Sequence, residues 1–318
     1  MRSPRSACPT ALVGLEAAPR NSLFSPKTAD TVDQELKLCA LVTGAGSGIG
    51  EACTRRLSNM GWRVFAGVLD ESQRTYLEQS RLANVTPLLL DITKADSIAG
   101  AAKTIADAVG ARGLAGLVNN AGIGVLGPVE YVPLELIRRQ LEVNFFGHVA
   151  VTQAFLPLLR QKSPGQAPGR IVNISSIAGR LTLPLFMPYA ASKHGIEALS
   201  DALRLELRPW KMHVACIEPG LIATPIMASS QAEADAALAA MPPEGRERYG
   251  YLFELMKNDT RLRSAAHPPD VVARAIAHAL TARRPQTRYV VGGMRWRFWM
   301  LSKLPDRLRD WVIEKSFS

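Results

Sequence analysis

Continuous apolar runs alternate with amphipathic stretches through most of this chain, and that alternation constrains its fold more than any other feature. The apolar runs cover residues 38–43, 63–68, 85–90, 114–118, 170–174, 213–217 and 289–291. Helical patterns lie between them, notably at 97–109, 134–161 and 188–208. Continuous apolar strands that alternate with helices form a parallel sheet covered on both faces. The sequence therefore predicts an α/β fold, a doubly wound parallel sheet in a single domain spanning residues 37–292.

Composition limits the class of protein. With 318 residues, 47% of them hydrophobic, the chain can bury a full core. It has no uncharged apolar run of about 18 residues, so we expect no membrane-spanning helix. Cysteines and histidines without metal-ligand or CxxC spacing predict no metal and favour a reducing, cytoplasmic environment. These residues are Cys8, Cys39, Cys53, Cys216, His148, His194 and His213.

Residues 1–36 form an extension rich in proline and serine. The first 29 residues carry four basic side chains against one acid, Glu16. This composition fits a mitochondrial or plastid transit peptide, and it fits a disordered tail equally well. Organelle targeting and a cytoplasmic location therefore both stay open.

A glycine-rich turn follows the first apolar run. Its pattern, Thr43-Gly44-x-x-x-Gly48-x-Gly50, joins a predicted strand to a predicted helix. Glycines let the chain turn tightly, and the first N–H groups of a helix attract phosphate. A glycine turn can also simply pack a helix against a sheet, but a turn between strand and helix favours nucleotide binding.

Tyr189 and Lys193 are four residues apart in a predicted helix, so their side chains share one face. A cation beside a phenol lowers the phenol pKa and makes tyrosine usable as a general acid or base. Ser176 follows the strand predicted at 170–174 and could steady a substrate carbonyl. The Tyr-x-x-x-Lys pattern also occurs by chance on helix surfaces, so its neighbouring motifs decide between the two interpretations.

Several motifs in a fixed order carry a family resemblance. They are Thr43-Gly44-x-x-x-Gly48-x-Gly50, Asn119-Asn-Ala-Gly122, Asn144, Ser176, Tyr189-x-x-x-Lys193 and Pro219-Gly220. Over about residues 37–292, their order and spacing resemble those of the short-chain dehydrogenases/reductases. The resemblance implies a Rossmann-type sheet, a nicotinamide cofactor and hydride transfer between an alcohol and a ketone or aldehyde. A non-catalytic cofactor sensor or scaffold is the alternative; such a relative is expected to lose the tyrosine or lysine, and both are present here.

The resemblance also implies catalytic roles. Tyr189 is the acid/base, and Lys193 lowers its pKa while holding the nicotinamide ribose. Ser176 orients the substrate oxygen. Asn144 helps to hold a water that links Lys193 to solvent.

Cofactor contacts are implied by the same motifs. Asp91 and Asn119 look like adenine-side and ribose-side contacts, and Ile222 and Thr224 resemble the segment that holds the carboxamide. The full implied set is Thr43, Gly44, Ser47, Gly48, Ile49, Gly50, Asp70, Asp91, Ile92, Asn119, Ala121, Gly122, Tyr189, Lys193, Pro219, Gly220, Ile222 and Thr224.

The choice between NAD and NADP depends on the end of the second strand. NAD enzymes usually place an acid there, and NADP enzymes place a base nearby. Val68 occupies the usual acid position and is followed by Leu69 and Asp70. No arginine or lysine occupies the glycine turn or the two positions after Val68. We therefore expect NAD, with NADP as the alternative.

Two apolar segments suggest the substrate class: residues 181–187 and a long segment after Ile222, expected as a helical substrate-loop insertion. The second carries Met227, Leu238, Met241, Leu252, Phe253, Leu255 and Met256. Flexible apolar linings suit bulky lipophilic ligands, and ordinary core or a dimer surface is the alternative. Segments 91–94, 116–122 and 197–204 look most like the retinol, hydroxysteroid and hydroxybutyrate dehydrogenase branch, which implies a lipophilic alcohol.

The long amphipathic stretches at 134–161 and 188–208 bear on assembly. Their apolar positions are Phe145, Phe146, Val149, Val151, Phe155, Leu158, Ile196, Leu199, Leu203 and Leu207. In relatives the corresponding helices form a four-helix dimer interface. The resemblance therefore implies a homodimer or homotetramer.

The C-terminal tail, residues 293–318, is basic and amphipathic. Residues 283–318 hold nine basic side chains against three acids. Apolar residues recur there at helical spacing, at Trp296, Met300, Leu304, Leu308 and Trp311. Such a helix suits peripheral contact with an anionic membrane. The alternative is a surface helix packed on the domain, and nucleic acid is not expected because no binding motif accompanies the charge.

Overall fold

The computed structural model describes residues 38–161, 167–258, 266–293, 296 and 300–316. Seven parallel strands form one sheet in the order β3-β2-β1-β4-β5-β6-β7. The strands are β1 (Cys39–Thr43), β2 (Arg63–Val68), β3 (Val85–Leu89), β4 (Gly116–Asn119), β5 (Arg170–Ile174), β6 (His213–Pro219) and β7 (Arg288–Val291). The strand order reverses between β1 and β4, and such a switch point leaves a crevice at the carboxyl ends of the strands.

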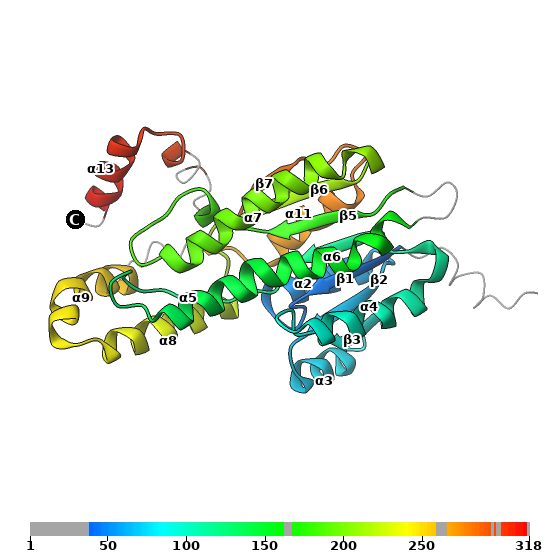
Figure 1. The fold of residues 1–318 in the computed structure, drawn as a ribbon, viewed down its shortest axis with the longest axis horizontal. Coiled ribbons are helices and arrows are strands. Elements are labelled where there is room, and N and C mark those ends of the chain that lie inside the picture. The colour runs from blue at the N-terminus through cyan, green and yellow to red at the C-terminus, as the bar shows by residue number, and fades with distance from the viewer. Residues whose placement is uncertain (1–37, 162–166, 259–265, 294–295, 297–299, 317–318) are drawn as a thin grey trace, which may run out of the picture. The chain divides into compact units, whose positions relative to one another are not determined.

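Helices cover both faces of the sheet (Figure 1). One face holds α2 (Gly48–Asn59), α3 (Glu71–Gln79) and α11 (Asp270–Thr281). The other holds α4 (Ala95–Val109), α6 (Gly147–Arg160) and α7 (Met187–Glu206). Successive residues of β1 alternate between the two cores, with Ala40 and Val42 in the first and Cys39 and Leu41 in the second. Burial on both sides explains why the strands are continuously apolar, and the doubly wound prediction is confirmed.

The remaining elements surround the carboxyl edge of the sheet or follow it. They are α5 (Leu134–Leu141), a π-helical turn (Glu142–Phe146), α8 (Pro225–Ala240), α9 (Pro243–Asn258), α13 (Asp306–Ser316) and three short 3-10 turns (Gly110–Arg112, Ile177–Gly179, Arg208–Trp210). Helices α8 and α9, in yellow in Figure 1, lie side by side beyond the sheet. They share a third apolar cluster with Leu126 and Leu185 from two loops. The expected helical insertion is therefore present.

Several sequence expectations can be compared with these elements. The helix expected at 134–161 is present as α5, the π-helical turn and α6, and the helix expected at 188–208 is α7. Helices α3 and α11 were not expected individually. None of the helices within the described ranges combines the length and apolar character needed to cross a bilayer. Residues 1–36, with their two open interpretations, lie outside the described residues, and the domain boundaries at 36 and 292 stay predictions.

Candidate active site

The glycine-rich turn between β1 and α2 presents backbone N–H groups to the carboxyl edge of the sheet. Gly44 and Gly48 have φ angles of +63° and +56°, which favour glycine. A Cβ on Gly44 would lie 2.8 Å from the Cα of Ala121, so glycine also permits close contact with the loop after β4. Ser47, the N-cap of α2, makes no side-chain capping bond. The first N–H groups of α2 are thus available to an anion.

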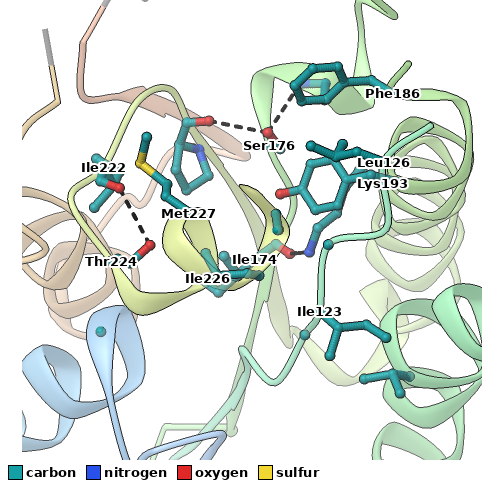
Figure 2. Close-up of a pocket in the computed structure, with 18 of the residues that line it drawn as sticks. Ile123, Leu126, Ile174, Ser176, Phe186, Lys193, Ile222, Thr224, Ile226 and Met227 are labelled. Carbon is teal, nitrogen blue, oxygen red and sulfur yellow. Dashed lines mark hydrogen bonds between the residues drawn. The ribbon is translucent and has the colours of Figure 1, made fainter. Parts of the chain in front are cut away.

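A cavity of about 1630 Å³ lies at the carboxyl ends of the central strands. Figure 2 shows Ser176, Lys193, Ile222 and Thr224 around part of it. The predicted site residues that line the cavity are Gly44, Ser47, Gly48, Ile49, Asp91, Ile92, Ala121, Gly122, Ser176, Tyr189, Lys193, Pro219, Gly220, Ile222 and Thr224. Residues far apart in the chain are therefore brought to one space, which joins the glycine turn to the Tyr189 region.

Asn119 and Thr43 occupy structural positions outside the cavity lining. Asn119 is buried at the end of β4, and its Nδ2 donates to Thr152 Oγ1 and Asn173 Oδ1, both at 2.9 Å. Thr43 Oγ1 accepts a 2.9 Å bond from the Asn120 N–H and so ties β1 to the end of β4. Asn119 does not line the cavity, and its ribose-side contact stays a prediction. Strand alternation directs that side chain into the core, and Asn120 lines the cavity instead.

Asp70 and Gly50 also lie outside the lining. Asp70 is exposed at the N-cap of α3, where its Oδ1 accepts bonds from Ser72 Oγ at 2.6 Å and Gln73 N at 2.9 Å. These two bonds lower the pKa of the Asp70 carboxyl. A Cβ on Gly50 would collide with the carbonyl oxygen of Gly44. Asp70 therefore caps a helix and Gly50 lets α2 pack on the turn, while Gln73 lines the cavity.

Asn144 lies in the π-helical turn between α5 and α6 and is fully buried. Its Oδ1 accepts from the N–H of Ile123 at 2.9 Å, and its Nδ2 donates to the carbonyl of Ile123 at 2.9 Å. The same Nδ2 lies 3.2 Å from Ser192 Oγ on α7. Single π-helical turns recur at functional sites, and this one holds the loop after β4 against α7. The water-holding role of Asn144 stays a prediction.

Ser176, Tyr189 and Lys193 enter the cavity from two elements. Ser176 follows β5, and its Oγ donates to the carbonyl of Pro219 at 3.4 Å. Tyr189 and Lys193 lie one turn apart on α7, with the Lys193 Nζ 5.6 Å from the Tyr189 ring centre. The Lys193 ammonium donates a 3.0 Å bond to the carbonyl of Ile174, visible in Figure 2. A hydroxyl, a phenol and an ammonium thus share one end of the cavity.

Burial shifts the pKa values of both α7 groups. Loss of solvent raises the pKa of the Tyr189 phenol, and a hydrogen bond with Ser176 acts in the opposite direction. Loss of solvent lowers the pKa of Lys193 to about 8, opposed by Cys216 and Glu197. The expected lowering of the Tyr189 pKa by Lys193 is therefore not found in the protein alone. Desolvation of the phenol is the larger effect, and the ammonium is directed at a backbone carbonyl.

Many of the side chains that line the cavity beyond Ser176 are apolar. They are Leu126, Leu181, Leu183, Leu185, Phe186, Ile226, Met227, Leu252, Leu255 and Met256. Of the lining residues expected in the insertion, Met227, Leu252, Leu255 and Met256 reach the cavity. Leu238, Met241 and Phe253 do not, and they pack in the third apolar cluster, which Leu252 and Met256 also contact. Residue type alone could not separate them, because successive helical side chains point in different directions.

Several polar lining residues were not singled out from the sequence. They are Gln73, Thr93, Asn120, Arg138, Arg139, Glu142, Ser230, Gln231, Tyr251 and Glu254. Asn120 lies inside the motif Asn119-Asn-Ala-Gly122, so the motif itself could have indicated that this residue belongs to the site. Residues of α5, α8 and α9 carried no comparable signal, because the way those helices fold over the cavity is a tertiary property.

The lining fits a nicotinamide dinucleotide. The turn at 44–48 offers open N–H groups and a close glycine approach at one end, and Tyr189 and Lys193 offer donors at the other. Asp91 lies between strand and helix, and its Oδ1 accepts from the N–H and hydroxyl of Thr93 at 3.0 and 2.6 Å. Within the described residues, no group of three or more His, Cys, Asp or Glu side chains is placed to hold a metal ion.

Comparisons with known proteins agree with this geometry. Residues 38–235 match the family model for short chain dehydrogenases. Retinol dehydrogenase 5 of Mus musculus is 37% identical over 280 residues, which cover 86% of each chain. The 17-beta-hydroxysteroid dehydrogenase type 6 of Bos taurus is 38% identical over 286 residues, which cover 87% of each chain.

A solved structure supports the fold and the cofactor class. The 3-ketoacyl-(acyl-carrier-protein) reductase of Brucella melitensis, complexed with NADH, has a TM-score of 0.65 and 26% identity, and the match covers 81% of this chain and 98% of that one. The chain therefore belongs to the short-chain dehydrogenase/reductase family, in the part that includes retinol and hydroxysteroid dehydrogenases, and is an NAD(P)-dependent oxidoreductase that acts on alcohol groups.

Proposed function

We propose that this enzyme interconverts a bulky lipophilic alcohol and its ketone or aldehyde, with Tyr189 as the acid/base. One observation carries the proposal: Ser176, Tyr189 and Lys193 line the same cavity as the glycine turn, and its far side is apolar. When bound, the nicotinamide cofactor supplies the group that accepts or donates hydride. The retinoid and steroid names of two relatives support the lipophilic class.

The chain's own groups divide the remaining work. The Ser176 hydroxyl, fixed near the Pro219 carbonyl, orients the substrate oxygen. The Tyr189 phenol gives its proton to that oxygen in reduction and takes it back in oxidation. An ammonium at Lys193 stabilises the phenolate that forms. Apolar side chains around the cavity keep water from the reacting oxygen.

We further propose NAD as the preferred cofactor. Val68, at the position where an acid is usual, is buried, and Leu69 lines the cavity as an exposed apolar residue. Asp70, the nearest carboxylate after this strand, faces solvent as a helix cap. A ribose phosphate would meet no arginine or lysine from positions 44–50 or 69–70. These positions therefore provide no positive charge to offset the negative charge of the phosphate.

Two further proposals concern partners. The first is a homodimer through α5–α6 and α7, supported by Phe146, which is 52% exposed beside α6. Most other apolar residues expected on that surface, such as Val151, Phe155 and Ile196, lie in the core. The second is peripheral membrane contact through the C-terminal tail, supported by exposed Trp296 and Trp311.

The experiment that tests the function is a substrate panel. Purified protein is assayed with NAD and NADP against retinoids, hydroxysteroids and aliphatic secondary alcohols, and with NADH and NADPH against the matching carbonyl compounds. We expect turnover with a cyclic or polyene alcohol and higher kcat/KM with NAD than with NADP. Saturable NADH binding without turnover of any panel member would instead support a non-catalytic cofactor sensor.

A further inference from the structure

A buried charge cluster lies next to the Lys193 turn of α7. It consists of Arg180, Glu197, Glu218 and Arg288, and the side chains of Glu197 and Glu218 are only 11% and 3% exposed. Arg288 Nε lies 3.0 Å from Glu197 Oε2 and 3.4 Å from Glu218 Oε1. Arg180 Nε lies 2.9 Å from Glu218 Oε1, and its NH2 lies 3.9 Å from Glu197 Oε2. Each carboxylate therefore contacts both guanidinium groups.

The buried charge cluster connects the segments that carry the active site. Arg180 follows the 3-10 turn that begins after Ser176. Glu218 directly precedes Pro219, whose carbonyl accepts from the Ser176 hydroxyl. Glu197 lies one helical turn beyond Lys193 on α7, and residues four apart share a face. Any change of charge in the cluster is therefore close to Lys193 as well as to the Ser176 segment.

Lys193 needs a counter-charge where it lies. Its side chain is buried, and its ammonium donates to the neutral carbonyl of Ile174. An ammonium removed from water is unfavourable unless an anion offsets it. Glu197 lies one helical turn from Lys193 on α7, and its charge, with Cys216, opposes the lowering of the Lys193 pKa by burial.

Three other titratable groups near Lys193 are neutral at neutral pH. The Tyr189 phenol has a raised pKa because it is buried, and burial lowers the pKa of His148 on α6 to about 3. The Cys216 thiol of β6 donates to Glu197 Oε1 at 3.1 Å, and burial keeps its pKa well above the ordinary value. At the outer end, Asp201 pairs with Arg288 and Arg204, both at 2.7 Å. Glu197 is thus the carboxylate that can act as the counter-charge of Lys193.

We propose that Glu197, held by Arg288, is the counter-charge that keeps Lys193 a cation inside the cavity. Glu197 is then a positioning residue: it touches neither substrate nor cofactor and acts through Lys193. Its effect on turnover rests on the proposed function, because a cationic Lys193 matters there for stabilising the Tyr189 phenolate. The state of Lys193 itself can be measured without turnover.

The test measures the pKa of Lys193 directly in the full-length protein. A trace of acetic anhydride is reacted with the protein across pH 6–11, and the peptide that carries Lys193 is quantified by mass spectrometry. The variants are Glu197→Gln, Arg180→Met and Glu206→Gln. Glu206 is an exposed carboxylate on the same helix, roughly 20 Å further along its axis, and serves as the matched control.

The expected shifts have opposite signs. Glu197→Gln lowers the Lys193 pKa by about one unit, because a neighbouring opposite charge is lost. Arg180→Met raises it, because a cation that shares Glu197 and Glu218 is removed. Glu206→Gln leaves it unchanged. If Glu197 and Arg180 had only structural roles, their replacement would not shift the Lys193 pKa in opposite directions.

Three results would overturn the proposal. They are a Glu197→Gln shift no larger than that of Glu206→Gln, a downward shift in Arg180→Met, and no shift in Arg180→Met. If Glu197→Gln does not fold, as judged by circular dichroism, Arg180→Met decides alone. Labelling needs no substrate, so a failure of the substrate panel would reject the proposed function and leave this test intact.

Discussion

Asn144 and Ile123 form a two-way amide contact, in which Oδ1 accepts from the Ile123 N–H and Nδ2 donates to the Ile123 carbonyl, both at 2.9 Å. This contact is part of a series. Gln140, Asn144, His148 and Thr152, spaced four apart, contact Val125, Ile123, Ala121 and Asn119, spaced two apart. Four helical residues rise about 6 Å and two extended residues about 6.6 Å, so each fourth helical residue lies opposite each second residue of the extended segment. The segment that lines the middle of the cavity is thus held by one helix face.

Replacing Asn144 tests this series. Asn144→Leu leaves the partly buried N–H of Ile123 without its side-chain partner, whereas the Ile123 carbonyl keeps a 3.0 Å bond from Gln140 Nε2. We expect the free energy of unfolding to fall by about 1–3 kcal/mol, the range for one buried polar group left unpaired. Urea denaturation measures this. Arg139→Leu, on the exposed side of the same helical run, should cost no more than about 0.5 kcal/mol, and equal losses in both variants would contradict the argument.

Replacing Tyr189 tests the proposed chemistry. Tyr189→Phe keeps the ring and removes the proton that the mechanism requires. We expect kcat to fall at least ~100-fold, in the range lost when general acid–base help is removed, while the NADH dissociation constant changes little. Steady-state kinetics on the best panel substrate and NADH fluorescence titration provide the two numbers. A Tyr189→Phe enzyme as active as the wild type would reject the mechanism.

The parts of this site that could be predicted are those that depend on the spacing of residues close together in the sequence. Tyr189 and Lys193 share a helix face, and the turn at 44–48 lies between a strand and a helix, so neighbouring residues carry the information. The contact between Arg288 and Glu197 joins residues that are 91 positions apart, and no local sequence pattern predicts such a contact. The sequence also could not show that Asn120, and not Asn119, lines the cavity, because the exact end of β4 decides which of the two adjacent asparagines faces it.

His148 predicts a specific loss of stability in acid. Burial, with a smaller contribution from Lys193, lowers its pKa to about 3, whereas an unfolded histidine titrates near ~6.5. Below that value the unfolded chain binds a proton that the folded protein does not, so the stability present above pH ~6.5 is lost as pH falls toward 3. Between pH 7 and 4.5 this amounts to about 3 kcal/mol.

The measurement is urea denaturation at pH 7 and pH 4.5. His148→Gln should show a smaller acid loss than the wild type, because glutamine cannot take up the proton. His194→Gln, at an exposed position on α7, is the control and should keep the wild-type loss. An unchanged acid loss in His148→Gln would show that other groups are responsible.

Phe146 tests the proposed dimer. Phe146 is 52% exposed beside α6, on the surface that a second copy would cover in the proposed dimer. Multi-angle light scattering of the wild type at micromolar concentration should give twice the chain mass or more. Phe146→Asp should shift the protein toward monomer, whereas Leu89→Asp, at an exposed position at the end of β3, should not. A monomeric wild type contradicts the proposal.

The C-terminal tail tests the proposed membrane contact. Trp296, Met300, Leu308 and Trp311 are all at least 47% exposed, whereas Leu304 is partly buried. Much of the apolar stripe is therefore exposed, as contact with a membrane surface requires. Nearby Lys303 and Arg307 are exposed cations, which favour an anionic surface. We expect the full-length protein to float with phosphatidylserine-containing vesicles at low salt and to be released when salt is raised, since screening weakens the charge attraction.

The double variant Leu308→Ser, Trp311→Ser should stay in the soluble fraction. The control Trp210→Ser, which removes an exposed tryptophan far from the tail in the sequence, should float like the wild type. Flotation of the double variant, or equal flotation with neutral vesicles, would mean that the tail does not bind an anionic membrane.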